Sequence, residues 1–191
     1  MLLVVALPVV ASVLTVMAAD MLVCPRDRGG FLHRERRISG GREFELLKLR
    51  TLRVDVLRGM KAPGDHARLH EADATKLTWA GKRLLKPWYL DELPQLLNVL
   101  RGDMSLVGPR PWPPAMVEGQ RARGVDYRLH VPAGWTGPAQ VAKGLDVSFE
   151  QLDLEYVDRC RRSSGPALAR YDVGILYRTL ATLLRREGLR F

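Results

Sequence analysis

Carboxylates and an arginine gather in one short stretch of the sequence. LDELPQLLNVLRGDMSLVGPRP, residues 90–111, places Asp91 beside Glu92, follows them with Asp103, and sets Arg110 between two prolines. Carboxylates attack phosphorus, move protons or hold a metal ion. The planar fork of an arginine suits bidentate contact with phosphate. The side chains in this order suit chemistry on a phosphate-bearing substrate.

A short amphipathic helix is predicted to position the carboxylate pair. Apolar residues recur at the spacing of one helical face, at Leu93, Leu96, Leu97 and Leu100. Asp91 stands at the expected N-cap, Pro94 fits the first turn, and Gly102 fits the C-cap. A helix N-terminus keeps a carboxylate ionised and attracts phosphate. Asp91 is therefore either the helix cap or a nucleophile, and the helix pattern leaves both roles open.

Composition restricts the class of partner. The chain has 191 residues, enough for one domain with a core, and a formal net charge of +9 that predicts an anionic partner. Nucleotide, phospholipid and nucleic acid all fit, but aromatic residues are few and are not interleaved with the cations as strand-stacking proteins require. We therefore expect no nucleic acid. Cys24 and Cys160 lie far apart and predict neither a disulfide framework nor a zinc site.

The N-terminal segment predicts attachment to a membrane. Residues 1–19 contain no charged side chain, and about 20 apolar residues is the length that crosses a bilayer. A signal peptide is the alternative, but no basic region precedes the apolar one. Arginines follow the segment and favour a cytosolic location for the rest of the chain. Pro8 should kink the helix, so we expect residues 1–24 to form a re-entrant helix inserted in the membrane.

Mixed elements are predicted for residues 25–191. Gly40 and Gly41 suit a hairpin turn, after which a strand places Lys48 and Arg50 on the same face as Phe44. The alternative for the two cations is a solvated strand face. The segment 57–80 is predicted as loop and short helix. The fold class is therefore α+β, a small single catalytic domain of several helices with a short β-hairpin.

The C-terminal segment is predicted as a helix with an apolar face and many arginines. The apolar face consists of Val173, Leu176, Leu180, Leu183 and Leu184, and the cations are Arg170, Arg178, Arg185, Arg186 and Arg190. Such a helix lies readily on an anionic lipid surface. The alternative is an ordinary helix that packs against a core, and the pattern does not separate the two.

Four stretches together resemble the bacterial sugar transferase family, the monotopic polyprenol-phosphate phosphoglycosyl transferases. The carboxylate stretch at 90–111 is similar to the central motif of that family. FLHRERRISGGREFELLKLRTL resembles its Q-x-R…F-x-x-x-K-x-R-T segment, and HVPAGWTGPAQVAKG resembles V-x-x-G-x-T-G-x-A-Q-V. FEQLDLEYVDRCRRSSGPALARYDVGILYRTL resembles D-x-x-Y-V…D-x-x-I-L-x-x-T-L. The four matches span nearly the whole chain.

The resemblance implies a transfer in two steps at the cytosolic face of the bacterial inner membrane. Asp91 would attack a nucleoside-diphosphate sugar, with UDP as the expected nucleotide, and release the nucleoside monophosphate. The phospho-sugar would then pass to a polyprenol phosphate, expected to be undecaprenyl phosphate, and initiate glycoconjugate assembly. Glu92 would handle a proton or metal, with Mg²⁺ held by Asp91 and Glu92. The implied partners are the sugar donor, the lipid acceptor and the bilayer.

The same resemblance assigns further site residues. Arg110, Lys48, Arg50 and Gln140 match family positions expected to bind substrate or phosphate. Asp103 and Gln140 fit structural roles equally well, as cap or buried hydrogen-bonding group. Three prolines are expected to have structural roles: Pro8, Pro109 and Pro111.

One departure from the family pattern lies just before the carboxylate pair. Family members usually carry an arginine followed by Ser or Thr there, whereas this chain reads GKRLLKPWYLDE. Either Lys86 or Arg83 could replace that arginine in phosphate binding. Two other functions stay in view: a family member that no longer turns over, and a basic, membrane-tethered binding or scaffold protein. The intact Asp91–Glu92 pair argues against loss of turnover.

Overall fold

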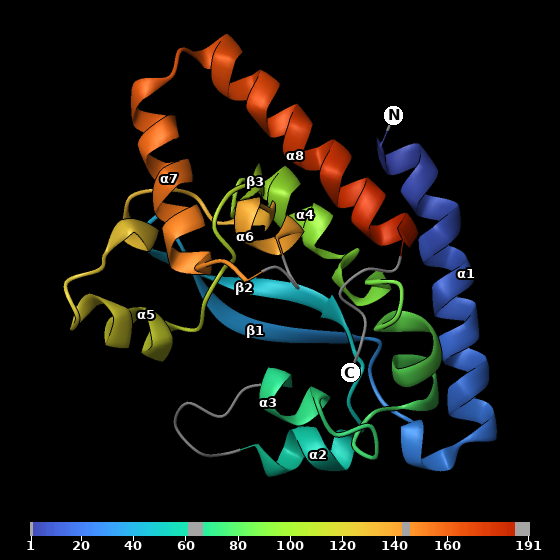
Figure 1. Cartoon of the computed structure of the whole chain (residues 1–191). Helices are drawn as coiled ribbons and strands as arrows, with labels where there is room; N and C mark the ends of the chain where they lie inside the picture. Colours follow the sequence, from blue (N-terminus) through green and yellow to red (C-terminus); the bar gives the residue numbers. More distant parts are fainter. Residues whose placement is uncertain (1, 61–66, 143–145, 186–191) are drawn as a thin grey trace. The chain divides into compact units, whose positions relative to one another are not determined.

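The computed structural model describes residues 2–60, 67–142 and 146–185, with side chains for all of these except 2–7, 68, 184 and 185 (Figure 1). The chain divides into two compact units. Unit 1 consists of residues 1–35 and 47–95, and unit 2 consists of residues 36–46 and 96–190. The predicted division after residue 24, between a membrane-inserted helix and a catalytic domain, stays a prediction. Helices and small sheets occur together, which confirms the α+β class.

Unit 1 is built around one long helix and several short elements. They are α1 (Leu2–Val23), η1 (Pro25–Asp27), α2 (Val54–Gly59), α3 (Ala67–Glu71), the π-helical turn η2 (Gly81–Leu85) and the 3-10 turn η3 (Leu90–Glu92). Val13 and Met17 of α1 are buried against Leu49, Ala80 and Leu85. The second half of α1 therefore belongs to the core that supports η2.

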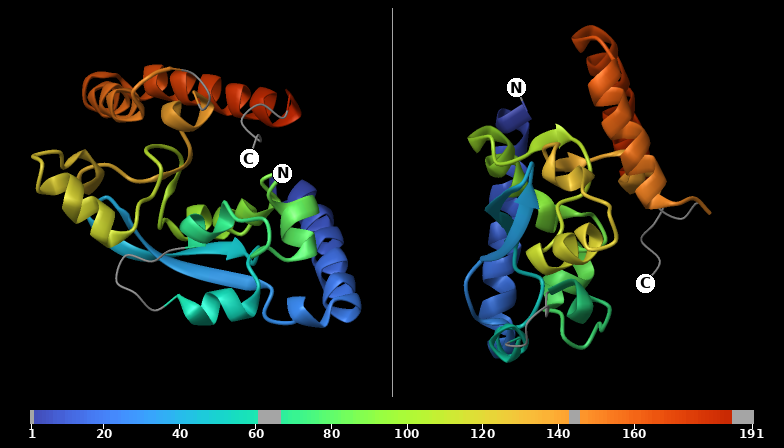
Figure 2. Two further views of the ribbon diagram at one scale, coloured as in Figure 1. Left: turned by 60° about the horizontal axis from the view of Figure 1, so that its bottom comes forward. Right: turned by 90° about the vertical axis from the view of Figure 1, so that its left-hand side faces the viewer.

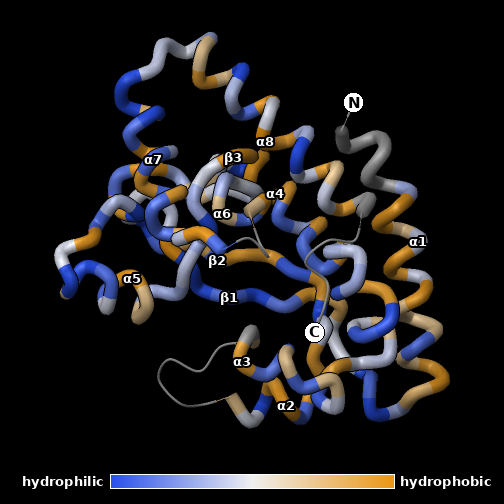
Figure 3. The backbone as a smooth tube through the Cα atoms, in the orientation of Figure 1, coloured by the Kyte–Doolittle hydropathy of each residue, from blue (hydrophilic) through white to orange (hydrophobic). Residues whose placement is uncertain are grey.

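The helix α1 is continuous through Pro8. One α-helical segment runs from Leu2 to Val23, and the reversal predicted at Pro8 is not confirmed (Figure 1). Most residues in the described part of α1 are apolar, as Figure 3 shows. Within the residues searched, no helix meets both the length and the apolarity required of a membrane span.

A β-hairpin contributes to both units. Strand β1 (Leu32–Ser39) pairs with β2 (Arg42–Leu49) across Gly40 and Gly41, whose positive φ angles of 53° and 76° suit a two-residue turn. The predicted hairpin is therefore confirmed. Within β2, burial begins at Leu46 and continues to the end of the strand. Arg50 lies one residue beyond β2, and its side chain is buried as well.

Unit 2 combines a small parallel sheet with five α-helices and a 3-10 turn. Its elements are α4 (Gln95–Arg101, whose first residue belongs to unit 1), β3 (Ser105–Val107), α5 (Pro114–Arg121), η4 (Tyr127–Leu129), β4 (Gly134–Thr136), α6 (Pro138–Val141), α7 (Phe149–Arg162) and α8 (Gly165–Arg185). Ser105 pairs with Gly134 and Val107 with Thr136. Helix α8 contacts β3, β4 and α6, and Figure 2 shows it following α7.

The apolar residues of α8 divide between two faces. Ile175 is buried with Val107 and Tyr156 in the core of unit 2. Val173, Tyr177 and Leu180 are 63%, 73% and 54% exposed. The predicted face is therefore not one packing surface, because two of its members, Val173 and Leu180, are exposed beside the exposed Arg170 and Arg178. The side chains of Leu184 and Arg185 lie outside the description, as do Arg186 and Arg190 altogether.

Candidate active site

The carboxylate pair lies in the 3-10 turn η3, not at the start of the following helix. Helix α4 begins at Gln95, directly after Pro94, so the predicted start at Asp91 is four residues too early. Proline favours a position at the very start of a helix, and here it sets the boundary. Asp91 caps no helix, because the only described group that donates to its carboxylate is Lys86. The cap interpretation of Asp91 is thereby removed.

Burial and a strained backbone mark the position of the pair. Asp91 is 1% exposed and Glu92 is 8% exposed. Tyr89, two residues before Asp91, has a left-handed φ of 53°, and it is the only non-glycine residue with positive φ in the described part of the chain. Such conformations are costly for a large side chain and persist where the surrounding structure holds them. The π-turn η2 lies just upstream, and π-turns often mark functional sites.

Lys86 connects the pair to a third carboxylate. Its Nζ atom lies 3.2 Å from Asp91 Oδ2 and 2.6 Å from Glu71 Oε2. Glu71 also accepts a hydrogen bond of 3.0 Å from Thr51 Oγ1. Arg83, the other residue considered for the missing family arginine, is exposed on η2. The contacts of Lys86 thus favour it over Arg83 as the cation beside Asp91.

The charges of this group act on one another strongly because the group is buried. Burial raises the pKa of Asp91 to about 6; Lys86 opposes that rise and Glu92 adds to it. Burial lowers the pKa of Lys86, but Asp91 and Glu71 outweigh it and the net pKa lies above the ordinary value. The pKa of Glu71 is lowered, because Lys86 and Lys48 outweigh its own burial. Glu71 and Lys86 therefore form a fixed ion pair beside a carboxylate that ionises near neutrality.

One oxygen of Asp91 has no hydrogen-bonding partner. Oδ2 receives Lys86, whereas Oδ1 is buried and has no partner among the described residues. A buried, unpaired carboxylate oxygen is unfavourable unless something else binds it. Oδ1 is thus available to attack phosphorus or to ligate a metal ion.

Lys48 and Arg50, predicted together, have different surroundings. Lys48 is buried, its Nζ atom lies 3.7 Å from Glu35 Oε2, and its charge favours ionised Asp91. The Arg50 guanidinium donates to the backbone carbonyls of Asp27, Gly30 and Leu52. These contacts give Arg50 a structural role, and they lend no support to its assignment as a phosphate ligand.

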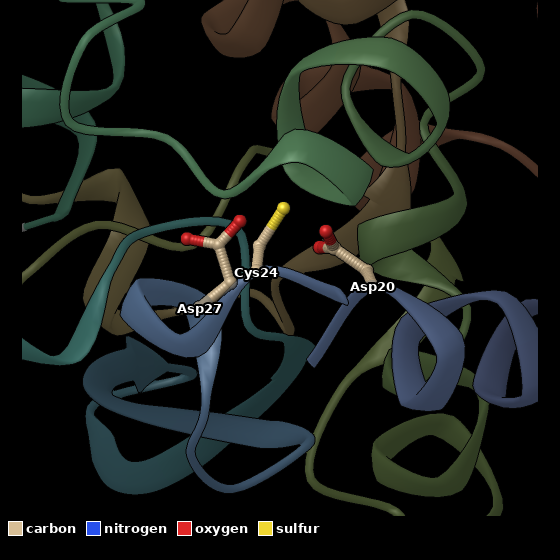
Figure 4. A group of neighbouring side chains, drawn as sticks. All are labelled: Asp20, Cys24 and Asp27. Atoms are coloured by element: carbon tan, nitrogen blue, oxygen red, sulfur yellow. The ribbon is translucent and has the colours of Figure 1, made fainter. Parts of the chain in front are cut away.

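A second acidic cluster lies at the end of α1. Asp20, Cys24 and Asp27 point toward one another (Figure 4), close enough to share a metal ion. The two carboxylates already accept the backbone N–H groups of Ala80 and Trp79, at 3.0 and 2.8 Å. Burial and the two aspartates raise the pKa of the Cys24 thiol, which disfavours the thiolate that ligates metals. The cluster therefore anchors the helical turn that leads to Lys86.

Other predicted site residues belong to unit 2. Arg110 follows β3 on the loop between Pro109 and Pro111, and its carbonyl accepts from Arg128 Nη1. Asp103 accepts a hydrogen bond of 2.8 Å from Asn98 Nδ2, which supports its structural role. The amide nitrogen and oxygen of the Gln140 side chain are both buried without a described partner. Gln140 is therefore still available for a ligand.

Sequence reasoning missed two parts of this arrangement. Glu71 lies in a polar segment predicted as loop and short helix, and no local sequence pattern marks it as a buried acid. Arg128 binds the carbonyl of Arg110, pairs with Asp153 at 2.7 Å and stacks over the Trp112 ring at 4.0 Å. Arg128 lies just before the stretch HVPAGWTGPAQVAKG, and no local sequence pattern distinguishes it from the other arginines.

Comparisons with known proteins agree on one family. The model of the family "Bacterial sugar transferase" matches residues 1–186. The chain is 34% identical over 196 residues to a UDP-galactose-lipid carrier transferase of Erwinia amylovora, covering 96% of this chain and 39% of the relative. It is 38% identical over 155 residues to the UDP-glucose:undecaprenyl-phosphate glucose-1-phosphate transferase of Caulobacter vibrioides, covering 76% and 55%.

A third relative extends the same pattern. The undecaprenyl-phosphate galactose phosphotransferase of Salmonella typhimurium is 34% identical over 178 residues, covering 85% of this chain and 35% of the relative. The chain thus spans less than two thirds of each of these three relatives. Because the family model matches nearly all of it, the chain belongs to the bacterial sugar transferase family.

Proposed function

We propose that the protein transfers a phospho-sugar from a nucleoside-diphosphate sugar to a polyprenol phosphate through a covalent intermediate on Asp91. The observation that carries this proposal is the Asp91 carboxylate itself, buried, held by Lys86 at Oδ2 and unpaired at Oδ1. The names of the relatives support a sugar donor and undecaprenyl phosphate as acceptor, and two of them name UDP donors. UDP is accordingly the proposed nucleotide.

The first step is attack by Asp91 Oδ1 on the phosphorus that carries the sugar. The new Oδ1–P bond forms as the bond from phosphorus to the oxygen of the nucleoside monophosphate breaks. A pKa of about 6 leaves Asp91 mostly ionised at neutral pH, as a nucleophile must be. In the second step an oxygen of polyprenol phosphate attacks the same phosphorus, and the P–Oδ1 bond breaks. Asp91 is thereby regenerated as a carboxylate.

Repulsion between the carboxylate and the anionic substrate must be reduced by positive charge. Lys86 is fixed at Asp91 Oδ2 and is held there by Glu71, while the charge of Lys48 also acts on Asp91. We propose that Asp91 and Glu92 would hold Mg²⁺, since two adjacent buried carboxylates supply the oxygen ligands that this ion prefers. Bound there, the ion would neutralise the diphosphate oxygens of the donor.

The transfer assay is the direct test of this function. Full-length protein in mixed micelles is incubated with undecaprenyl phosphate, Mg²⁺ and each of a panel of radiolabelled nucleotide sugars, and the lipid is then extracted. We expect label in the lipid phase with at least one donor, with release of an equal amount of nucleoside monophosphate. If no donor in the panel yields either product, the protein is not a phosphoglycosyl transferase.

Attachment to the inner membrane is part of the same proposal. Helix α1 has no charged side chain between Pro8 and Ala19, and α8 exposes Val173, Tyr177 and Leu180 beside arginines. Salt screens contacts between charges but leaves apolar insertion intact, so the protein should stay with the membrane fraction through a wash at about 1 M salt. Detergent should release it. Recovery of the full-length chain in the high-salt supernatant would show that charge alone holds it there.

A further inference from the structure

Four arginines surround a hollow in unit 1 that the transfer reaction does not use. The hollow has a volume of about 480 Å³, and its lining consists of Arg26, Arg28, Arg53, Val54, Asp55 and Arg58. A single aspartate faces four guanidinium groups, so the lining carries a clear excess of positive charge. None of these residues touches Asp91, Lys86 or Glu71 through a described hydrogen bond or ion pair.

The frame of the hollow is held tightly. Arg50 binds the carbonyls of Asp27 and Gly30, which fixes the segment that carries Arg28. A Cβ atom on Gly29 would lie 2.4 Å from Val54 Cγ2, so only glycine lets this segment approach α2 so closely. The backbone segments that carry Arg28 and Arg53 are therefore brought together by the fold.

Two of the four guanidinium groups are oriented by backbone carbonyls. Arg28 Nε donates to Met21 O at 3.1 Å, and Arg53 Nη1 donates to Thr75 O at 3.0 Å. Arg53 also binds Asp55 with two nitrogens, at 3.2 and 2.9 Å. Arg26 and Arg58 are exposed, and neither has an ion-pair partner in the described part of the chain. Placing such cations side by side is unfavourable without a counter-ion.

We propose that this arginine hollow binds a phosphate group. Guanidinium forks give charge-assisted, bidentate hydrogen bonds to phosphate oxygens, and the oriented Arg28 and Arg53 reduce the entropy lost on binding. Leu22 and Val23, just before Arg26, are 76% and 81% exposed. Exposed apolar side chains next to arginines are typical of protein segments that lie on an anionic lipid surface. A lipid phosphate is therefore the expected source, an inference that rests on the proposed membrane attachment, and free phosphate is the other source.

Binding is tested on the full-length protein in micelles of neutral detergent. One arm titrates phosphatidylglycerol into the micelles, and the other titrates inorganic phosphate into the buffer, both followed by calorimetry at low salt. The double variant Arg26→Gln/Arg58→Gln should bind at least about tenfold more weakly than wild type in the lipid arm, since it loses two charge-assisted contacts. The control Arg121→Gln/Arg123→Gln removes the same charge from exposed positions outside the hollow and should keep wild-type affinity.

The two arms identify the source of the phosphate, and the variants decide whether the site exists. Weaker binding in the Arg26/Arg58 variant alone supports a phosphate site in the hollow. The titration in which the weakening occurs identifies the ligand as lipid phosphate or free phosphate. An equal loss of affinity in both double variants means general charge attraction and overturns the proposal. The proposal also fails if the wild-type protein binds neither phosphatidylglycerol nor inorganic phosphate. Phospho-sugar transfer is assayed separately, so a failed transfer reaction and an absent phosphate site give different results.

Discussion

Mixed with a nucleoside-diphosphate sugar and Mg²⁺ in the absence of polyprenol phosphate, the protein should gain the mass of one phospho-sugar, on the peptide that contains Asp91. Without an acceptor the second step cannot occur, so the acyl phosphate accumulates. Mass spectrometry of the intact chain and of its peptides measures the adduct. Adding undecaprenyl phosphate should remove the adduct and produce the lipid-linked sugar.

Asp91→Asn should abolish the adduct and the lipid product together. An amide is not a competent nucleophile toward phosphorus, and the loss of a catalytic nucleophile lowers turnover by about 10⁴-fold or more. Release of nucleoside monophosphate should stop as well. Near-normal turnover in this variant would leave Asp91 as a metal ligand in a single displacement. An adduct on a different peptide would instead assign the nucleophile elsewhere.

Loss of activity in Asp91→Asn should come without loss of stability. The pKa of Asp91 lies near 6 in the folded protein, above the ordinary value of 3.8, so ionised Asp91 destabilises the fold increasingly as the pH rises from about 4 to 6. Asparagine removes that charge and should raise the melting temperature above that of wild type at pH 8 without Mg²⁺. The gain is on the order of 2 kcal/mol and should shrink to nothing near pH 4. Melting curves at both pH values separate a lost nucleophile from a damaged fold.

The sequence predicted the parts of the site whose geometry is local. A carboxylate pair next to a proline and an apolar helix is recognisable from adjacent residues, as is the hairpin turn at Gly40 and Gly41. The start of α4 was misplaced because Asp91 and Pro94 are both acceptable near a helix N-terminus, and spacing does not rank them. The left-handed Tyr89 and the 3-10 turn after it decide the matter, and neither has a signature in the sequence.

Long-range contacts account for most of what the sequence did not reveal. Glu71 precedes Lys86 by 15 residues and reaches it only because α3 and η2 fold together in unit 1. Arg50 matches a family position, yet its guanidinium donates hydrogen bonds to backbone carbonyls, one of them 23 residues away in the sequence. Residue type and spacing could not distinguish such an internal anchor from a substrate ligand. The choice between a lipid-facing and a core-packing α8 stayed open for a related reason, because periodicity identifies apolar residues but not which of them a neighbouring strand covers.

The second large effect is expected at Lys86. Lys86→Met should slow formation of the Asp91 adduct by about 10²- to 10³-fold, because it removes a buried positive charge 3.2 Å from the carboxylate that meets an anionic substrate. Lys86→Arg should recover part of the rate if charge is the requirement. Lys82→Met is the control, since Lys82 is exposed on the same π-turn, and it should leave the rate unchanged. Single-turnover kinetics with excess protein measure the step directly.

Glu71→Gln tests whether Glu71 acts through Lys86. Burial alone lowers the pKa of Lys86, and the charges of Asp91 and Glu71 hold it above the ordinary value. Removing one of these charges should lower the pKa of Lys86, so the fall in rate on the alkaline side should begin at a lower pH than in wild type. A purely structural role for Glu71 would reduce the rate equally at every pH. If the rate of Glu71→Gln falls at the same alkaline pH as that of wild type, Glu71 does not act through Lys86. The double variant Glu71→Gln/Lys86→Arg provides the second test, because a guanidinium stays charged throughout this pH range. If the alkaline shift disappears in the double variant, the effect of Glu71 is on the lysine.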